Sequence, residues 1–236
     1  MFGLIPVALA FITRKNLTEN PDFIRNAEAR KVHHHHRIPN LKQLFITPRI
    51  AWQTIGIMLM AMVEEAGYDG IISWMPSMMQ KKLHTNVTNS SLWMISTIIG
   101  FTLGAIVFGK LLDKKGPRIA FSTFFIISAI SVFAIPLSFN AITLVIAATV
   151  VGFFVAATYS GYGVLVSRLY PMNIRVTANN LIENVGSCIG GLAPMAIGFM
   201  MQYSSIMMIM IMLSLMFIVS LAVMWSIPNL KKLSKV

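Results

Sequence analysis

Charged residues are scarce in this chain of 236 residues. Asp, Glu, Lys and Arg make up 11% of it, against roughly 25% in soluble globular domains, whereas hydrophobic residues make up 56%. This composition excludes a water-soluble fold. Cysteine is also nearly absent: with Cys188 alone, an intramolecular disulfide and a cysteine-based metal cluster are excluded. The sequence therefore predicts a protein that crosses the membrane several times.

Long apolar stretches recur between short polar breaks. A helix needs about 20 apolar residues to cross the hydrocarbon core, and backbone groups in lipid must be hydrogen-bonded within their own segment. We therefore predict an all-α membrane protein with six transmembrane helices. They cover residues 50–78, 91–112, 119–139, 141–166, 177–201 and 206–227.

Three other segments flank the predicted bundle of residues 50–227. Residues 1–12 are apolar but reach only about 18 Å as a helix. Ala8-Leu9-Ala10 resembles a signal-peptide cleavage site, but no basic n-region precedes it and the apolar run before it is very short. The end of a helix whose beginning is missing is therefore favoured over a signal peptide. Residues 13–49 are a hydrophilic loop, and residues 228–236 are a basic tail. Four consecutive histidines, His33–His36, could bind a transition metal, but such a run gives no fixed geometry, so we predict neither a metal site nor a cofactor.

The basic residues gather on one side of the predicted helices. Seventeen of the nineteen Lys and Arg lie in residues 13–49, at 110–118, at 168–175 or in the tail, and Lys81 and Lys82 lie opposite. Because cytoplasmic loops are enriched in Lys and Arg, we expect residues 13–49 and the C-terminus to be cytoplasmic in a multi-pass protein of the cell (plasma or inner) membrane. The positive charge then sets topology, and we expect no nucleic-acid partner.

Acidic side chains inside the predicted spans are the candidate functional groups, because charge in a membrane is costly. They are Glu64, Glu65, Asp69 and Glu183, and no Lys or Arg is buried with them. Glu65 and Asp69 are four residues apart and share a helix face with Tyr68 beside them. Two carboxylates on one face repel, so one of them should hold a proton, as proton coupling requires. Gly67 and Gly70, which flank these acids, are expected to let the helix bend or unwind here. The alternatives are that this end of the helix opens into the outer vestibule, where the acids are simply hydrated, or that the acids form structural pairs.

A second polar stripe lies in the span at 177–201. Asn180 precedes Glu183 by three residues and Asn184 by four, so the three share one face. Such a stripe faces a central cavity or bonds to a neighbouring helix, and hydration at the membrane interface is the alternative for Glu183. There is no Walker loop, zinc motif or Ser/His/Asp constellation, so we expect no enzymatic activity.

Five short motifs follow one another along the chain. They are Arg14-Lys15 with Glu19-Asn20-Pro21; Gly67-Tyr68 with Trp74-Met75-Pro76 and Gln80; Gly109, Leu111, Asp113, Gly116 and Arg118; Leu169-Tyr170-Pro171 with Arg175 and Thr177; and Asn184, Gly186, Gly190 and Pro194. In this order, and on these sides of six predicted spans, they resemble the major facilitator superfamily of secondary transporters. The resemblance is to the branch of proton-coupled metabolite, aromatic-acid and sialate symporters.

That resemblance covers only the second half of the family's twelve helices, whose two halves enclose a central site. It implies the end of helix six, the central cytoplasmic loop and helices seven to twelve, without helices one to five. It also implies a symporter for protons and a small metabolite, an organic acid or a sugar acid. A sugar porter half and a truncated, non-transporting membrane protein are the alternatives. The implied cytoplasmic gating residues are Glu19, Gly109, Asp113, Gly116, Arg118 and Arg175.

Three positions depart from the family pattern. Arg168 stands where the family usually has Glu, and residues 228–230 replace the usual Pro-Glu-Thr, so both alter the expected gating network. For Asp113, the resemblance implies a partner in the other half of the transporter. Ser187 stands where this branch often has Arg, a candidate partner for a substrate carboxylate. This third departure argues against an anionic substrate.

Overall fold

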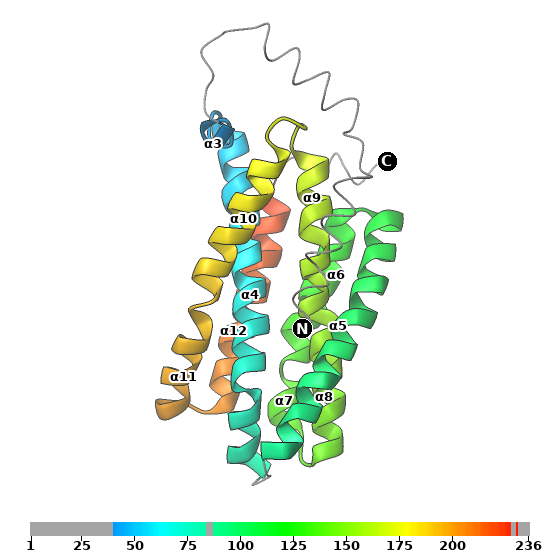
Figure 1. Cartoon of the computed structure of the whole chain (residues 1–236), viewed down its shortest axis with the longest axis vertical. Coiled ribbons are helices and arrows are strands. Elements are labelled where there is room, and N and C mark those ends of the chain that lie inside the picture. The colour runs from blue at the N-terminus through cyan, green and yellow to red at the C-terminus, as the bar shows by residue number, and fades with distance from the viewer. Residues whose placement is uncertain (1–39, 84–86, 228–229, 231–236) are drawn as a thin grey trace, which may run out of the picture. The chain divides into compact units, whose positions relative to one another are not determined.

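A computed structural model describes residues 40–83, 87–227 and 230, and every regular element in these ranges is helical (Figure 1). The all-helical fold class is therefore confirmed for this part of the chain. The predicted partial helix at 1–12, Glu19, most of the loop at 13–49 and most of the tail lie outside the described residues. The elements are α3 (Asn40–Gln43), α4 (Pro48–Leu83), α5 (Val87–Lys115), α6 (Pro117–Ser131), α7 (Ala134–Leu137), α8 (Ala141–Phe154), η1 (Ala156–Gly161), α9 (Tyr162–Leu169), α10 (Arg175–Gly190), α11 (Ala193–Tyr203) and α12 (Ile206–Ser226).

Five helical segments of the described chain are long and apolar enough to cross a membrane. They match the last five predicted spans and run over Trp93–Lys115, Pro117–Leu137, Ala141–Leu169, Arg175–Tyr203 and Ile206–Ser226. The first predicted span corresponds to α4, which has 36 residues and is long enough to cross. Its three acidic residues lower its hydropathy, and it is not among the five.

Three of these spans are interrupted, and two of the breaks precede a proline. Proline has no N–H to donate to the carbonyl four residues earlier. α6 accordingly ends just before Val132, four residues ahead of Pro136, and α10 ends at Gly190, four residues ahead of Pro194. The third break is the 3₁₀ segment η1, where Ser160 Oγ donates a hydrogen bond to the Ala157 carbonyl at 2.7 Å. Such back-bonding by hydroxyls bends helices.

α4 is one continuous helix from Pro48 to Leu83, so it does not unwind at Gly67 or Gly70. These glycines provide close packing instead. A Cβ at Gly67 would lie 2.7 Å from Phe217 Cζ of α12, and a Cβ at Gly70 would collide with Ile197 of α11. Small residues let membrane helices approach closely, so Gly67 and Gly70 hold α4 against its neighbours.

The helices pack in two groups that meet at α4 and α12. α4 lies against α10, α11 and α12, while α5 packs on α8 and η1, and α6 packs on α12 (Figure 1). Aromatic side chains fill the second group: Phe108 meets Phe121 edge to face with ring centroids 5.0 Å apart, and Phe121 lies 5.3 Å from Tyr162. This packing fixes η1 opposite the middle of α4.

The contact between α5 and α8 depends on glycines that touch the facing backbone. A Cβ at Gly152 would collide with the Thr97 carbonyl and lie 3.0 Å from Thr97 Cα, which cannot move independently of its helix. We therefore expect Gly152→Val to lower the free energy of unfolding by at least about 1–3 kcal/mol, the usual cost of overpacking. The measurement is the melting temperature of the purified chain in detergent.

Gly109 is the matched control for this substitution. It also lies within a helix, α5, but a Cβ there would have nothing within 4 Å. Because Val is also favoured over Gly in a helix interior, by a few tenths of a kcal/mol, Gly109→Val should melt at about the wild-type temperature. Equal melting of Gly152→Val and wild type would contradict this packing.

Candidate functional site

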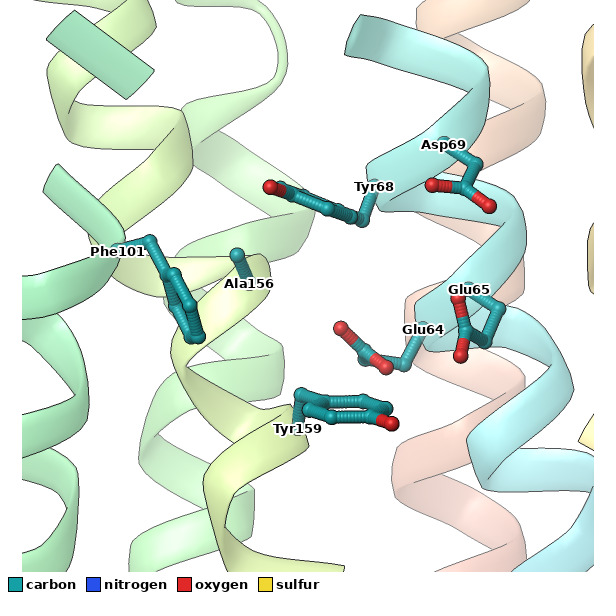
Figure 2. Close-up of a pocket in the computed structure, with 7 residues that line it drawn as sticks. All are labelled: Glu64, Glu65, Tyr68, Asp69, Phe101, Ala156 and Tyr159. Atoms are coloured by element: carbon teal, nitrogen blue, oxygen red, sulfur yellow. The ribbon is translucent and has the colours of Figure 1, made fainter. Parts of the chain in front are cut away.

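A cavity of about 240 Å³ lies where α4 faces α5 and η1 (Figure 2). Residues four apart share a helix face, so α4 presents two adjacent rows to it, Glu64 with Tyr68 and Glu65 with Asp69. The structure thus brings together four of the predicted site residues. The lining residues are Glu64, Glu65, Tyr68 and Asp69 from α4, Phe101 from α5, and Ala156 and Tyr159 from η1.

Glu64 is the buried acid of this site. Its side chain is 1% exposed, and its Oε2 atom has no hydrogen-bond partner among the described residues. The hydroxyl of Tyr162, in the first turn of α9, is likewise buried without a partner in that part of the chain, and the two residues lie within electrostatic range of one another. A buried polar group without a hydrogen bond is unfavourable, and an unpaired buried charge far more so.

Glu65 lies in a different environment. Its Oε1 atom accepts a hydrogen bond from Ser187 Oγ of α10 at 2.8 Å, at a partly exposed position. α10 can approach this closely because of Gly190: a Cβ there would lie 2.6 Å from Glu65 Cβ and 2.9 Å from the Met62 carbonyl oxygen. Ser187 is therefore part of the site, and its only signal in the sequence is the departure from Arg at this position.

Three aromatic residues and a third acid complete the wall. Tyr68 packs on Phe101 with ring centroids 6.3 Å apart, and Tyr159 reaches the cavity from η1. Asp69 lines the cavity and is partly exposed. None of the described lining residues is a Lys, Arg or His. Carboxyl and phenol groups without a basic partner can exchange protons and donate hydrogen bonds to a polar solute.

The predicted stripe on α10 does not join this cavity lining. Asn180 and Asn184 are exposed and Glu183 is partly exposed. Asn184 Nδ2 donates to the Asn180 carbonyl at 2.6 Å, so this amide is bound to its own helix. Within the described chain, no group of three or more His, Cys, Asp or Glu residues could hold a metal ion.

At the predicted cytoplasmic end, Asp113 pairs within the chain. Arg168 Nη2 of α9 lies 3.2 Å from Asp113 Oδ1, in an exposed ion pair. Arg168, which stands where the family usually has Glu, thus provides a partner for Asp113 within this chain, while the expected partner in the other half stays a prediction. An exposed pair contributes about 0–1 kcal/mol, so its value lies in aligning α5 with α9 and not in stability.

Two other residues of the predicted gating motif, Gly116 and Arg118, lie where α5, α6 and α12 meet. Gly116 has φ 81° in the turn between α5 and α6, a conformation that favours glycine. Arg118 stacks over Trp225 of α12, with its guanidinium carbon 4.1 Å from the ring centroid, and donates to the Trp225 carbonyl at 3.1 Å. Arg118 therefore ties α6 to α12 and does not pair with Asp113, its close neighbour in sequence.

The Leu-Tyr-Pro motif joins α9 to α4. The Tyr170 hydroxyl and Thr54 Oγ1 lie 2.7 Å apart, and Arg175 Nε donates to the Tyr170 carbonyl at 3.4 Å. Burial raises the pKa of the Tyr170 phenol, although its hydrogen bond with Thr54 acts in the opposite direction. The phenol therefore stays neutral and keeps this contact across the physiological pH range.

Comparison with known proteins places this fold in a family. The sequence profile of the Major Facilitator Superfamily matches residues 55–236, most of the chain. The chain belongs to the major facilitator superfamily. This confirms the resemblance and, with the five apolar helical spans, the prediction of a multi-pass membrane protein. It also confirms that the chain is no enzyme, because this is a family of transporters.

Three relatives from bacteria match the chain over part of their own length. A "Putative metabolite transport protein" of Haemophilus influenzae is 27% identical over 234 residues, which cover 98% of this chain and 58% of the relative. The "Cis,cis-muconate transport protein" of Acinetobacter baylyi is 29% identical over 59% of this chain and 34% of its own length. The "Probable 4-methylmuconolactone transporter" of Cupriavidus pinatubonensis is 25% identical over 83% of this chain and 44% of its own length. This major facilitator chain thus spans less than two thirds of each relative.

Proposed function

We propose that this chain forms the C-terminal six-helix half of a proton-coupled symporter for a small metabolite. The carrying observation is the acid-lined cavity on α4, in a member of a transporter family. α4 is then the seventh helix and α5 the eighth. The ninth to twelfth helices are α6–α7, α8–η1–α9, α10–α11 and α12, which together with α4 and α5 make six spans.

The proposed substrate is an organic acid or a sugar acid. The relatives whose printed names mention muconate and 4-methylmuconolactone support an organic acid. The cavity on this chain carries carboxyls and phenols without a basic group in its described lining. A carboxylate substrate would therefore take its cation from the complementary six-helix half, while this half supplies hydrogen-bonding groups and proton-binding carboxyls.

Transport would proceed by alternating access. In such transporters two helix bundles rock against one another around a site near the middle of the membrane. The interrupted helices here suit that motion, because η1 and the break after Gly190 both lie beside the acid-bearing stretch of α4. Irregular backbone in a membrane is tolerated where it is buried in protein or lines a cavity.

The test is uptake of labelled muconate into liposomes that contain this chain and a complementary half from a relative. An inward proton gradient should drive accumulation, and a protonophore should abolish it. Accumulation of a neutral sugar in preference to muconate would favour a sugar porter, and an absence of any saturable uptake would contradict the proposed function.

We propose an orientation with residues 13–49 and the C-terminus in the cytoplasm, which rests on the asymmetry of the basic residues. In a Cys188→Ser background, needed because Cys188 is exposed, a cysteine at Phe139 should react with an impermeant maleimide in sealed cells. A cysteine at Lys114 should react only after permeabilisation. Labelling of both positions in sealed cells, or of Lys114 alone, would contradict this orientation.

A further inference from the structure

Glu64 points into the cavity, yet one of its oxygens is sealed from it. Figure 2 shows the carboxyl directed from α4 toward the opposite wall. The side chain is 1% exposed, and Oε2 is buried with no hydrogen-bond partner in the described chain. This burial is present in the chain without a complementary half. A basic residue from a complementary half therefore cannot reach Oε2 in this conformation.

The groups around Glu64 offer it no positive charge. α4 contributes Glu65, Asp69 and Tyr68, η1 contributes Tyr159, and α9 contributes Tyr162. Of the other elements that pack on α4, α12 places Phe217 near this level and α5 places Phe101, neither of which titrates. Near this level α10 carries two titratable side chains, Glu183 and Cys188, and neither of them can carry a positive charge.

A metal ion does not fit this position. Hard cations need several oxygen ligands around them, and the described residues contain no group of three or more His, Cys, Asp or Glu that could hold one. A proton needs no space and converts the carboxylate to a neutral acid that can itself donate a hydrogen bond. Among the ways to neutralise Glu64, protonation is the one that this packing permits.

Glu65 and Asp69 do not meet the same constraint. Glu65 accepts a hydrogen bond from the Ser187 hydroxyl. Both carboxyls are partly exposed, so water can solvate their charge. This contrast separates the three acids by environment. Glu65 and Asp69 can stay ionised and contact solute, whereas an ionised Glu64 would be a buried charge without a partner.

We infer that Glu64, and not Glu65 or Asp69, holds the exchangeable proton of this transporter. The inference rests on the proposed function and deepens it. The carboxylic acid of Glu64 is the loaded state. In the unloaded state its proton has passed to water in the cavity, and the Tyr162 hydroxyl turns to donate a hydrogen bond to the remaining carboxylate. That hydroxyl is buried without a partner in the described chain and lies within electrostatic range of Glu64.

Infrared spectroscopy of the purified full chain in lipid tests this directly, without transport. A protonated carboxyl has a carbonyl stretching band separate from the bands of carboxylates and amides. We expect this band at neutral pH in wild type and in Glu65→Gln, and its loss in Glu64→Gln. Because Gln resembles a neutral Glu in shape, Glu64→Gln should fold, which monodisperse elution and an unchanged helical signal would verify.

A second variant tests the role of Tyr162. Tyr162→Phe keeps the ring against Phe121 but removes the donor for the carboxylate, so the protonated band should persist to higher pH than in wild type. An unchanged band in Glu64→Gln, or no band in wild type at neutral pH, would overturn the inference. A carbonyl band that disappears in Glu64→Gln supports the inference even if the liposomes show no uptake. An absence of uptake bears only on the proposed function.

Discussion

Glu64→Gln should abolish proton-driven accumulation of substrate in the assembled transporter while substrate exchange continues. The variant is locked in a neutral form that resembles the loaded state, so it can bind and exchange substrate but cannot release a proton. Coupling requires both protonation states of the acid. Glu64 is buried without a hydrogen-bond partner for Oε2 in the described chain, so it is the acid that a proton must neutralise. The measurement is uptake into liposomes under an imposed proton gradient, compared with counterflow without a gradient.

Glu65→Gln is the matched control on the same helix. It also removes one acid, but this carboxyl is partly exposed and accepts a hydrogen bond from the Ser187 hydroxyl. We expect it to change substrate affinity and to keep the dependence on the proton gradient. If Glu65→Gln uncouples transport and Glu64→Gln does not, the expectation from the sequence, that the Glu65 and Asp69 pair carries the proton, is the better account.

Introducing an arginine at Ser187 should change how the site handles anions. The Ser187 hydroxyl lies 2.8 Å from Glu65 Oε1, so a guanidinium there can pair with Glu65. In Ser187→Arg/Glu65→Gln the arginine is instead free for a substrate carboxylate. A hydrogen bond to a charged group contributes about 1.5–3 kcal/mol, and every 1.4 kcal/mol is about tenfold in affinity. We therefore expect the double variant to bind a dicarboxylate about tenfold or more tightly than Glu65→Gln.

Two further variants separate charge from shape. Ser187→Ala in the Glu65→Gln background should show no gain, because it adds no cation. Ser187→Arg alone should gain less than the double variant, since Glu65 then competes for the guanidinium. Equal dicarboxylate binding by Glu65→Gln and the double variant would show that Ser187 does not face the substrate.

The membrane helices could be predicted because each is a long apolar run bounded by charges, glycine or proline. The predicted span at 141–166 corresponds to Ala141–Leu169, and that at 177–201 to Arg175–Tyr203. The breaks inside them were not predicted. Pro136 and Pro194 are visible signals for two of them, but the 3₁₀ turn at Ala156–Gly161 depends on local hydroxyl contacts.

The sequence predicted which acidic residues gather on α4, but it did not predict how their burial differs. Helical periodicity pairs Glu65 with Asp69 and leaves Glu64 on an adjacent row, so the sequence gives no reason to prefer Glu64. Its burial is a property of the folded chain, in which α12 packs on α4 and Tyr162, about a hundred positions further along, comes within electrostatic range. In the same way, the pair between Asp113 and Arg168 joins residues 55 positions apart, whereas proximity in sequence favoured Arg118.

The central claim is that this chain supplies one of the two bundles that alternating access requires. The most direct test is muconate uptake into three sets of liposomes, containing this 236-residue polypeptide alone, a complementary six-helix half alone, or both together. We predict saturable, proton-gradient-driven uptake only with both, and its loss in Glu64→Gln. Equal uptake by this polypeptide alone would contradict the account, because it would mean that a single bundle, or a dimer of it, completes the transport cycle.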